Sequence, residues 1–182
     1  MARACEFDQS AVLTSAMEAF RRGGFGSVSI RTLEDATGLK AGSIYNSFGD
    51  KQGLFRAAFA HYVEHVLRAR IAEHAPPEAG LAGLRALFVS LMHEPDDGAL
   101  GCLITNSAVE FGGSDAQPAA VHAALEILAD LFGQRVPAAQ SVKLLALYQG
   151  ILVLVRAGWN KPALEAMVQA EFDQLDGEPN VA

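Results

Sequence analysis

Residues Val28–Phe59 read VSIRTLEDATGLKAGSIYNSFGDKQGLFRAAF and carry the clearest helix signals of the chain. Ser29 and Asp50 are residue types that cap helix N-termini, and Gly38 is a type that ends helices. The pattern predicts a short helix that ends at Gly38, a tight turn at Gly-Leu-Lys, a second short helix over about 41–48 and a third helix after Asp50. This order is the helix-turn-helix pattern, which many helical hairpins share without binding DNA.

The faces of the second short helix point toward DNA. Helical spacing puts Ala41, Ile44 and Phe48 on one apolar side, which we expect to enter the core. The other sides carry small or hydrogen-bonding residues, namely Gly42, Ser43, Tyr45 and Asn46. An ordinary surface helix favours long charged residues, whereas small and amide side chains suit a helix that enters a major groove. The pattern alone leaves open a plain helical hairpin that contains a weakly propagating helix.

Flanking residues favour the DNA-binding interpretation. Lys40 precedes the second short helix and Lys51 begins the next, so both are placed to meet phosphates, as is the Tyr45 hydroxyl. Arg31 and Thr32 begin the preceding helix, whose N-terminal N–H groups suit an anion. The predicted DNA-binding residues are Arg31, Thr32, Lys40, Ala41, Gly42, Ser43, Tyr45, Asn46 and Lys51.

This stretch resembles the DNA-binding head of the tetracycline-repressor (TetR) family of bacterial transcriptional regulators. The family's run is a turn that ends in Gly-Leu/Val, then small residues followed by Leu/Ile-Tyr-x-x-Phe, then Asp-Lys-x-x-Leu. The sequence supplies these as Ala36–Leu39, Gly42–Phe48 and Asp50–Leu54, and the resemblance covers about the first 60 residues. Only Arg3 precedes the head, so the sequence departs from the family by lacking a basic N-terminal arm.

The remaining sequence predicts an all-α protein of about nine helices. A first helix capped by Asp8 is expected to end at RRGGFG, and the third helix of the head to continue as far as Pro76. Further helices are expected over about 78–93, 98–111, 117–132, 138–157 and 162–175. We predict a DNA-binding domain over 1–52 and an effector-binding and dimerisation domain over 53–182.

Charge and composition set the class of protein. The formal net charge is −7, yet residues 1–60 carry +1 and residues 61–182 carry −8, so the acidity lies outside the head and permits a polyanionic partner there. The longest unbroken apolar run, Ile151–Val155, is far shorter than the roughly 20 residues of a membrane span, so we expect a cytoplasmic protein and no membrane partner. Cys5 and Cys102 are too few to indicate a disulfide framework or a zinc site.

The resemblance implies a body that binds a small molecule and forms a homodimer through its last two helices. Ser141–Asn160 is apolar on most sides, and the last helix carries an apolar stripe, which independently permits a C2 four-helix interface. The predicted interface residues are Leu147, Ile151, Leu154, Leu164, Met167, Val168 and Phe172. A dimer predicts two DNA half-sites about 34–36 Å apart, or a multiple, and so a near-palindromic operator.

GCLITNSAVEF (Gly101–Phe111) resembles a Gly-Cys-Leu-x-x-Asn-Ser/Thr-Ala-x-Glu segment of a TetR subgroup. Asn106 either bonds a ligand or ties its helix to a neighbour, and Cys102 is either a core residue or an oxidant-sensing thiol. The predicted effector pocket consists of His61, His65, Leu87, Leu91, Cys102, Asn106 and Tyr148.

The predicted function is a ligand-responsive transcriptional repressor, not an enzyme, that a small-molecule effector releases from double-stranded operator DNA. It needs no cofactor and no metal. One alternative is a redox-sensing repressor that acts through Cys102. An alternative from another class is a small helical zinc enzyme, because HYVEH places His61, Glu64 and His65 in a His-x-x-Glu-His pattern.

Overall fold

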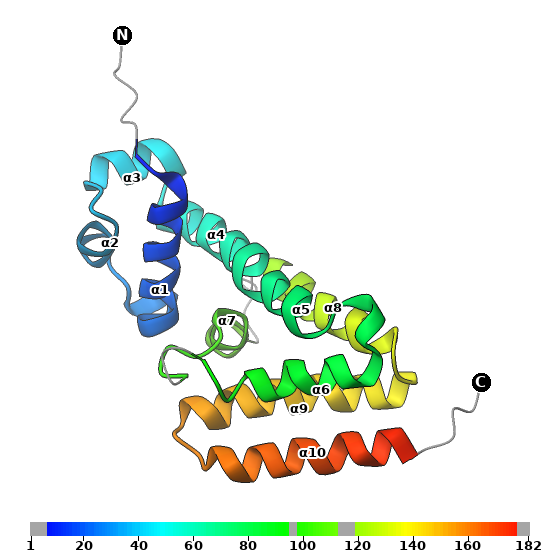
Figure 1. Ribbon diagram of the computed structural model, residues 1–182. Helices are drawn as coiled ribbons and strands as arrows, with labels where there is room; N and C mark the ends of the chain where they lie inside the picture. The colour runs from blue at the N-terminus through cyan, green and yellow to red at the C-terminus, as the bar shows by residue number, and fades with distance from the viewer. Residues whose placement is uncertain (1–6, 95–97, 113–118, 178–182) are drawn as a thin grey trace. The chain divides into compact units, whose positions relative to one another are not determined.

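The computed structural model describes residues 7–94, 98–112 and 119–177, and these are helical with no strand (Figure 1). Its elements are α1 (Gln9–Ser27), α2 (Ile30–Thr37), α3 (Ala41–Phe48), α4 (Lys51–Tyr62), the π-helix η1 (Val63–Arg68), α5 (Ala69–His74), the 3-10 helix η2 (Pro77–Ala79), α6 (Gly80–Ser90), α7 (Leu103–Phe111), α8 (Ala119–Gly133), α9 (Ala138–Arg156) and α10 (Lys161–Gly177). Because α4, η1 and α5 follow one another directly, and η2 runs directly into α6, the described residues form nine continuous helical segments. The predicted all-α class is confirmed.

Capping residues fix the bounds of the head helices as the sequence predicts. The Asp8 carboxylate accepts from the Ser10 N–H (2.9 Å) at the start of α1. The Ser29 hydroxyl accepts from the Thr32 N–H (3.1 Å), and Gly38 ends α2 with a φ of 72°. The Asp50 carboxylate accepts from the Gly53 N–H (2.6 Å) at the start of α4. These bonds satisfy N–H groups that lack a partner within their own helix.

The end of α1 differs from the prediction. Gly24 has non-helical angles (φ 77°, ψ 162°), but the chain makes one further turn and α1 ends at Ser27. The physical reason lies on α7, whose Glu110 carboxylate accepts from the N–H groups of Phe25 (2.7 Å) and Gly26 (2.6 Å). A distant side chain therefore holds the extra turn, and the local sequence gives no sign of it.

By its internal packing the chain divides into two compact units, Met1–Leu67 with Cys102–Ala123, and Arg68–Gly101 with Ala124–Ala182. This division by packing groups α4 and α7 with the head helices, because α1 contacts both of them. An aromatic cluster fills this first unit, with Phe20 and Phe55 edge to face at 5.1 Å and Phe25 at 5.4 Å from Phe111. The domain boundary by function stays a prediction.

The second unit has its own core. Phe88 of α6 meets Tyr148 of α9 at 5.3 Å and Phe172 of α10 at 5.3 Å between ring centroids. Figure 1 shows α9 and α10 lying side by side as an antiparallel hairpin, and Lys143 pairs with Glu171 across them at 2.7 Å. Within the described residues α9 alone is long and apolar enough to cross a membrane by length and composition, a test that core helices of soluble proteins also pass.

Candidate nucleic-acid interface and body cavity

The turn between α2 and α3 is held by one long-range cap. Lys40 occupies the N-cap position of α3 but makes no side-chain cap bond. Glu34 of α2 supplies it instead, because its Oε1 accepts from the Ala41 N–H at 2.8 Å. Leu33 and Ile44 are fully buried beneath the turn. The cap and this apolar contact together orient α3. Local capping rules do not reveal the role of Glu34, because its partner Ala41 lies seven residues away.

The outer face of α3 lies as predicted relative to the core. Ile44 is fully buried, whereas Gly42 and Asn46 are exposed and Tyr45 retains 49% of its surface. Ser43 and Ala41 are half-buried. A Cβ added at Gly42 would meet no heavy atom within 4 Å, so packing within the protein does not require glycine there. The small size of this face therefore has no explanation in the core.

The flanking residues divide into two groups. Arg31 and Thr32 are exposed at the start of α2 and Lys40 is exposed just before α3, although the Thr32 hydroxyl already contacts the Ser29 hydroxyl at 2.8 Å. Lys51 is placed differently from the expectation. Its ammonium donates to the carbonyls of Phe25 (2.9 Å) and Val28 (3.0 Å) and lies 4.3 Å from the Phe25 ring centroid. The cation therefore caps the C-terminal end of α1, where helix carbonyls lack partners.

Asn106 and Glu110 hold α7 against the end of α1. The Asn106 amide donates to the Arg21 carbonyl at 3.1 Å, one turn before the two N–H groups that Glu110 binds. The sequence left open whether Asn106 bonds a ligand or ties its helix to a neighbour. This hydrogen bond corresponds to the second role, because it joins α7 to α1. Cys102 precedes α7 as a free, buried thiol with 6% exposure. Cys5 and Arg3 lie outside the described residues.

The two histidines of the HYVEH pattern lie close together. Their ring centroids are 4.3 Å apart, and His61 Nε2 is 3.0 Å from the Thr14 hydroxyl of α1. Burial, and next the nearby His65, lower the pKa of His61 below its ordinary 6.5. No group of three or more His, Cys, Asp or Glu side chains among the described residues is arranged to hold a metal ion.

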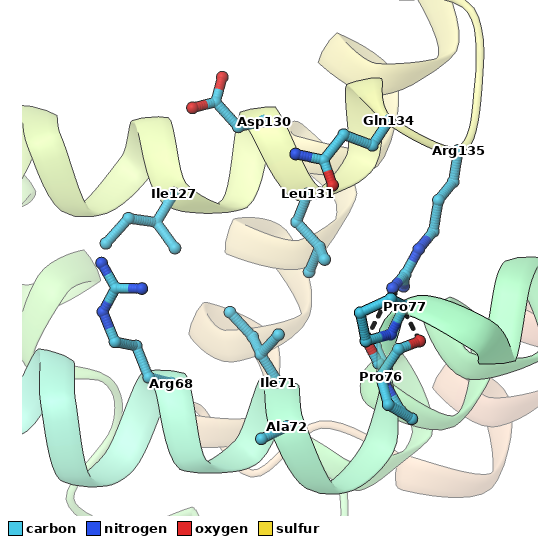
Figure 2. A pocket seen from close by; sticks show the side chains of 11 residues that line it. Arg68, Ile71, Ala72, Pro76, Pro77, Ile127, Asp130, Leu131, Gln134 and Arg135 are labelled. Atoms are coloured by element: carbon cyan, nitrogen blue, oxygen red, sulfur yellow. Dashed lines mark hydrogen bonds between the residues drawn. The ribbon is translucent and has the colours of Figure 1, made fainter.

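The predicted effector pocket does not coincide with the cavity observed in the second unit. A cavity of about 580 Å³ lies between α5, η2 and α8 (Figure 2). Its lining residues are Arg68, Ile71, Ala72, Ala75, Pro76, Pro77, Ile127, Asp130, Leu131, Gln134 and Arg135. None of the predicted pocket residues is among them. Leu87 and Leu91 are fully buried in the core, and the predicted effector pocket stays a prediction.

Most of the predicted dimer residues also belong to the core of the second unit. Ile151, Leu164, Val168 and Phe172 are buried at 3% exposure or less, so they are not available to a partner. Leu147 and Leu154 are half-buried, and Met167 is exposed. The exposed stripes are instead Val142, Ala146 and Val153 on α9, and Ala163, Ala166, Met167 and Ala170 on α10. The predicted interface consisted of the larger apolar residues of α9 and α10. In both helices, smaller or β-branched residues are exposed instead.

These elements define a class of protein, an all-helical chain with an N-terminal helix-turn-helix. Residues 12–58 match the family described as "Bacterial regulatory proteins, tetR family". The helix-turn-helix head of this chain is therefore similar to the DNA-binding domain of that family.

Curated relatives extend this match beyond the head. The chain is 33% identical over 105 residues to the HTH-type transcriptional repressor ComR of Escherichia coli, covering 56% of this chain and 50% of ComR. It is 32% identical over 113 residues to the uncharacterized HTH-type transcriptional regulator YezE of Bacillus subtilis, covering 60% and 58%. The chain thus spans about half the length of the curated relatives it matches.

Solved structures share the fold over nearly the whole chain. A cysteine mutant of the TetR family regulator CifR, complexed with 26-base-pair operator DNA, matches with a TM-score of 0.81 and 23% identity, over 94% of this chain and 98% of that one. A TetR regulator from Chloroflexus aurantiacus matches with a TM-score of 0.79 and 23% identity, over 92% and 93%. At this level of identity the likeness establishes the fold.

Proposed function

We propose that this chain is a cytoplasmic transcriptional repressor, not an enzyme, that binds a near-palindromic operator as a homodimer and releases it when a small molecule binds the body. The observation that carries the proposal is the outer face of α3. Gly42 costs helix stability there, and no neighbouring atom of the described residues would obstruct an alanine side chain. A partner that approaches the backbone closely, such as the major groove, accounts for the glycine.

The exposed residues suggest a division of roles on DNA. Arg31, Lys40 and Tyr45 are exposed, and their charged and hydroxyl groups would position α3 on phosphates. Asn46 is exposed near the middle of the outer face and would read a base, with Ser43 beside the groove wall. Lys51 is left out of this set because its ammonium already has three partners within the protein.

The dimer part of the proposal rests on the exposed stripes of α9 and α10. The most apolar window of α9 is only one-third buried within the chain. The exposed residues Val142, Ala146 and Val153 recur every four and then seven residues, the spacing that puts them along one helix face. The alanines of α10 would let a second copy approach closely, and a four-helix interface between two copies would cover both stripes.

What is known of similar proteins supports the same function. ComR is named a transcriptional repressor, and the CifR variant was solved with double-strand operator DNA. We further place this chain in the subgroup that carries the Gly-Cys-Leu-x-x-Asn-Ser/Thr-Ala-x-Glu segment. In that subgroup we expect Asn106 and Glu110 to hold α7 on the end of α1, as they do here.

The decisive experiment is a DNase footprint of the purified protein on the promoter beside its own gene. We expect protection of two half-sites whose centres are about 34–36 Å apart, or a multiple. Asn46→Ala should reduce the preference for this site over random DNA by about 10–100-fold, the value of one bidentate base contact. Lys40→Ala should weaken both DNAs equally and lower the salt slope by about one. Equal loss on both DNAs for both variants would contradict the division of roles.

A further inference from the structure

We propose that the cavity between α5, η2 and α8 binds a small organic anion, a carboxylate on an apolar body. The inference rests on the proposed function in one respect, since it names the chemical class of the effector. The binding site itself stands on the cavity alone. Its volume of about 580 Å³ falls within the range of roughly 300–1,000 Å³ typical of small-molecule sites.

The middle of the cavity is apolar. Figure 2 shows Ile71 of α5 pointing toward Ile127 and Leu131 of α8 across the space between the two helices. All three side chains are only half-buried, although other apolar residues of the second unit, such as Leu128, are fully buried. Incomplete burial of these side chains leaves apolar surface that the body of a ligand would cover.

One wall carries a fixed positive charge. Arg135 Nη2 donates to the carbonyls of Ala75 (2.7 Å) and Pro76 (3.0 Å), which holds the guanidinium at the end of α5 (Figure 2). Arg135 makes no ion pair with any described residue, and its Nη1 is buried with no hydrogen-bond partner among them. A buried donor without a partner is costly, and an anion beside Arg135 would relieve that cost.

The charges of the lining differ in sign from the rest of the body. Arg68 and Arg135 against Asp130 give the lining a formal charge of +1, whereas residues 61–182 as a whole carry −8. In Figure 2 the Asp130 carboxylate extends away from Ile71 and Leu131. A positively charged cleft in an acidic surface favours an anion. A cation would be repelled from the cleft and attracted to the acidic surface around it.

The test uses octanoate as the probe, with 1-octanol and octylammonium as neutral and cationic probes of equal chain length. Isothermal titration of the full chain should give a Kd for octanoate at least about tenfold below those of the other two, since a charge-assisted bond is worth about that factor. Ile127→Trp should abolish octanoate binding by filling the cavity. Equal affinity for octanoate and octanol would overturn the proposal.

Arg135→Gln tests the wall directly, because glutamine keeps a donor for the two carbonyls and removes the charge. It should raise the Kd for octanoate about tenfold and leave octanol unchanged, whereas Arg156→Gln, which removes an exposed charge on α9, should change neither. If Arg135→Gln does not fold, Asp130→Asn replaces it, and octanoate should then bind about threefold tighter. An unchanged Kd in the folded variant would contradict the proposal.

DNA binding separates this inference from the proposed function. If octanoate binds in an Arg135-dependent way and the footprint persists, the anion site stands and the ligand-responsive part of the function falls. If no footprint forms under any condition, the proposed repressor function is contradicted. The isothermal titration with octanoate then tests the anion site independently of DNA binding.

Discussion

The outer face of α3 and the end of α1 are two polar regions of the first unit. Their polar side chains differ in whether they already have partners within the protein. The outer face of α3 exposes Gly42, Tyr45 and Asn46, and nothing in the described residues requires its small size. The end of α1 gathers Lys51 and Glu110, whose charged groups bind backbone atoms of the same short segment. A polar side chain is available to a partner only when folding has not already used its hydrogen bonds. The following predictions test that distinction.

The largest effect is expected at Lys51. Lys51→Ala removes two charge-assisted hydrogen bonds and the contact with the Phe25 ring, and should lower the free energy of unfolding by about 2–3 kcal/mol. Lys40→Ala removes an exposed lysine at the N-terminal end of α3 and should change stability by less than about 0.5 kcal/mol. Urea denaturation measures both. If Lys51→Ala were as stable as Lys40→Ala, the cap at the end of α1 would contribute nothing.

The second effect concerns Glu110. Glu110→Gln leaves an amide with one acceptor where a carboxylate bound two N–H groups, and should lower the free energy of unfolding by about 1–2 kcal/mol. Glu18→Gln, an exposed position on α1, is the matched control and should have no measurable effect. Hydrogen exchange at Phe25 and Gly26 should also accelerate in Glu110→Gln alone. Equal exchange in both variants would argue against the contact.

How far the sequence predicts this molecule depends on the range of each interaction. Ser29, Gly38 and Asp50 act on neighbours within a few residues, so the bounds of α2 and the start of α4 followed from local chemistry. Glu110 acts over more than 80 residues, and neither periodicity nor capping rules reveal such a partner. Lys51 was assigned to phosphate for the same reason.

The buried and exposed faces of the body helices were harder to predict than those of the head. Apolar residues occur on both faces of these helices, so their type alone does not indicate which face is buried. Val168 and Phe172 enter the core of the second unit, while Met167 beside them is exposed. The cavity was missed because Arg135, the cation held against its wall, lies in the loop after α8, where no motif marks it.

The third effect is smaller and has opposite signs in two measurements. Gly42→Ala should raise the free energy of unfolding by about 0.5–1 kcal/mol, because alanine favours helix and meets no neighbour. The same substitution should weaken binding to the footprinted DNA, since the methyl group would stand between α3 and the groove. Gly53→Ala is the control, because its Cβ would lie 1.8 Å from the Phe48 carbonyl oxygen and should destabilise the protein. Unchanged DNA affinity in Gly42→Ala would remove the main support for the interface.

The smallest effect is the pH dependence at His61, in the last turn of α4. Because the pKa of His61 is lowered in the folded protein, the unfolded chain binds more protons near pH 6.5. The contribution of His61 to stability is therefore complete above pH 6.5 and declines as the pH falls below it. His61→Gln keeps a donor for the Thr14 hydroxyl and removes the titration, so its Tm should fall less than that of the wild type between pH 7.5 and pH 5.5. Parallel Tm profiles would show that burial and the nearby His65 do not lower the pKa of His61.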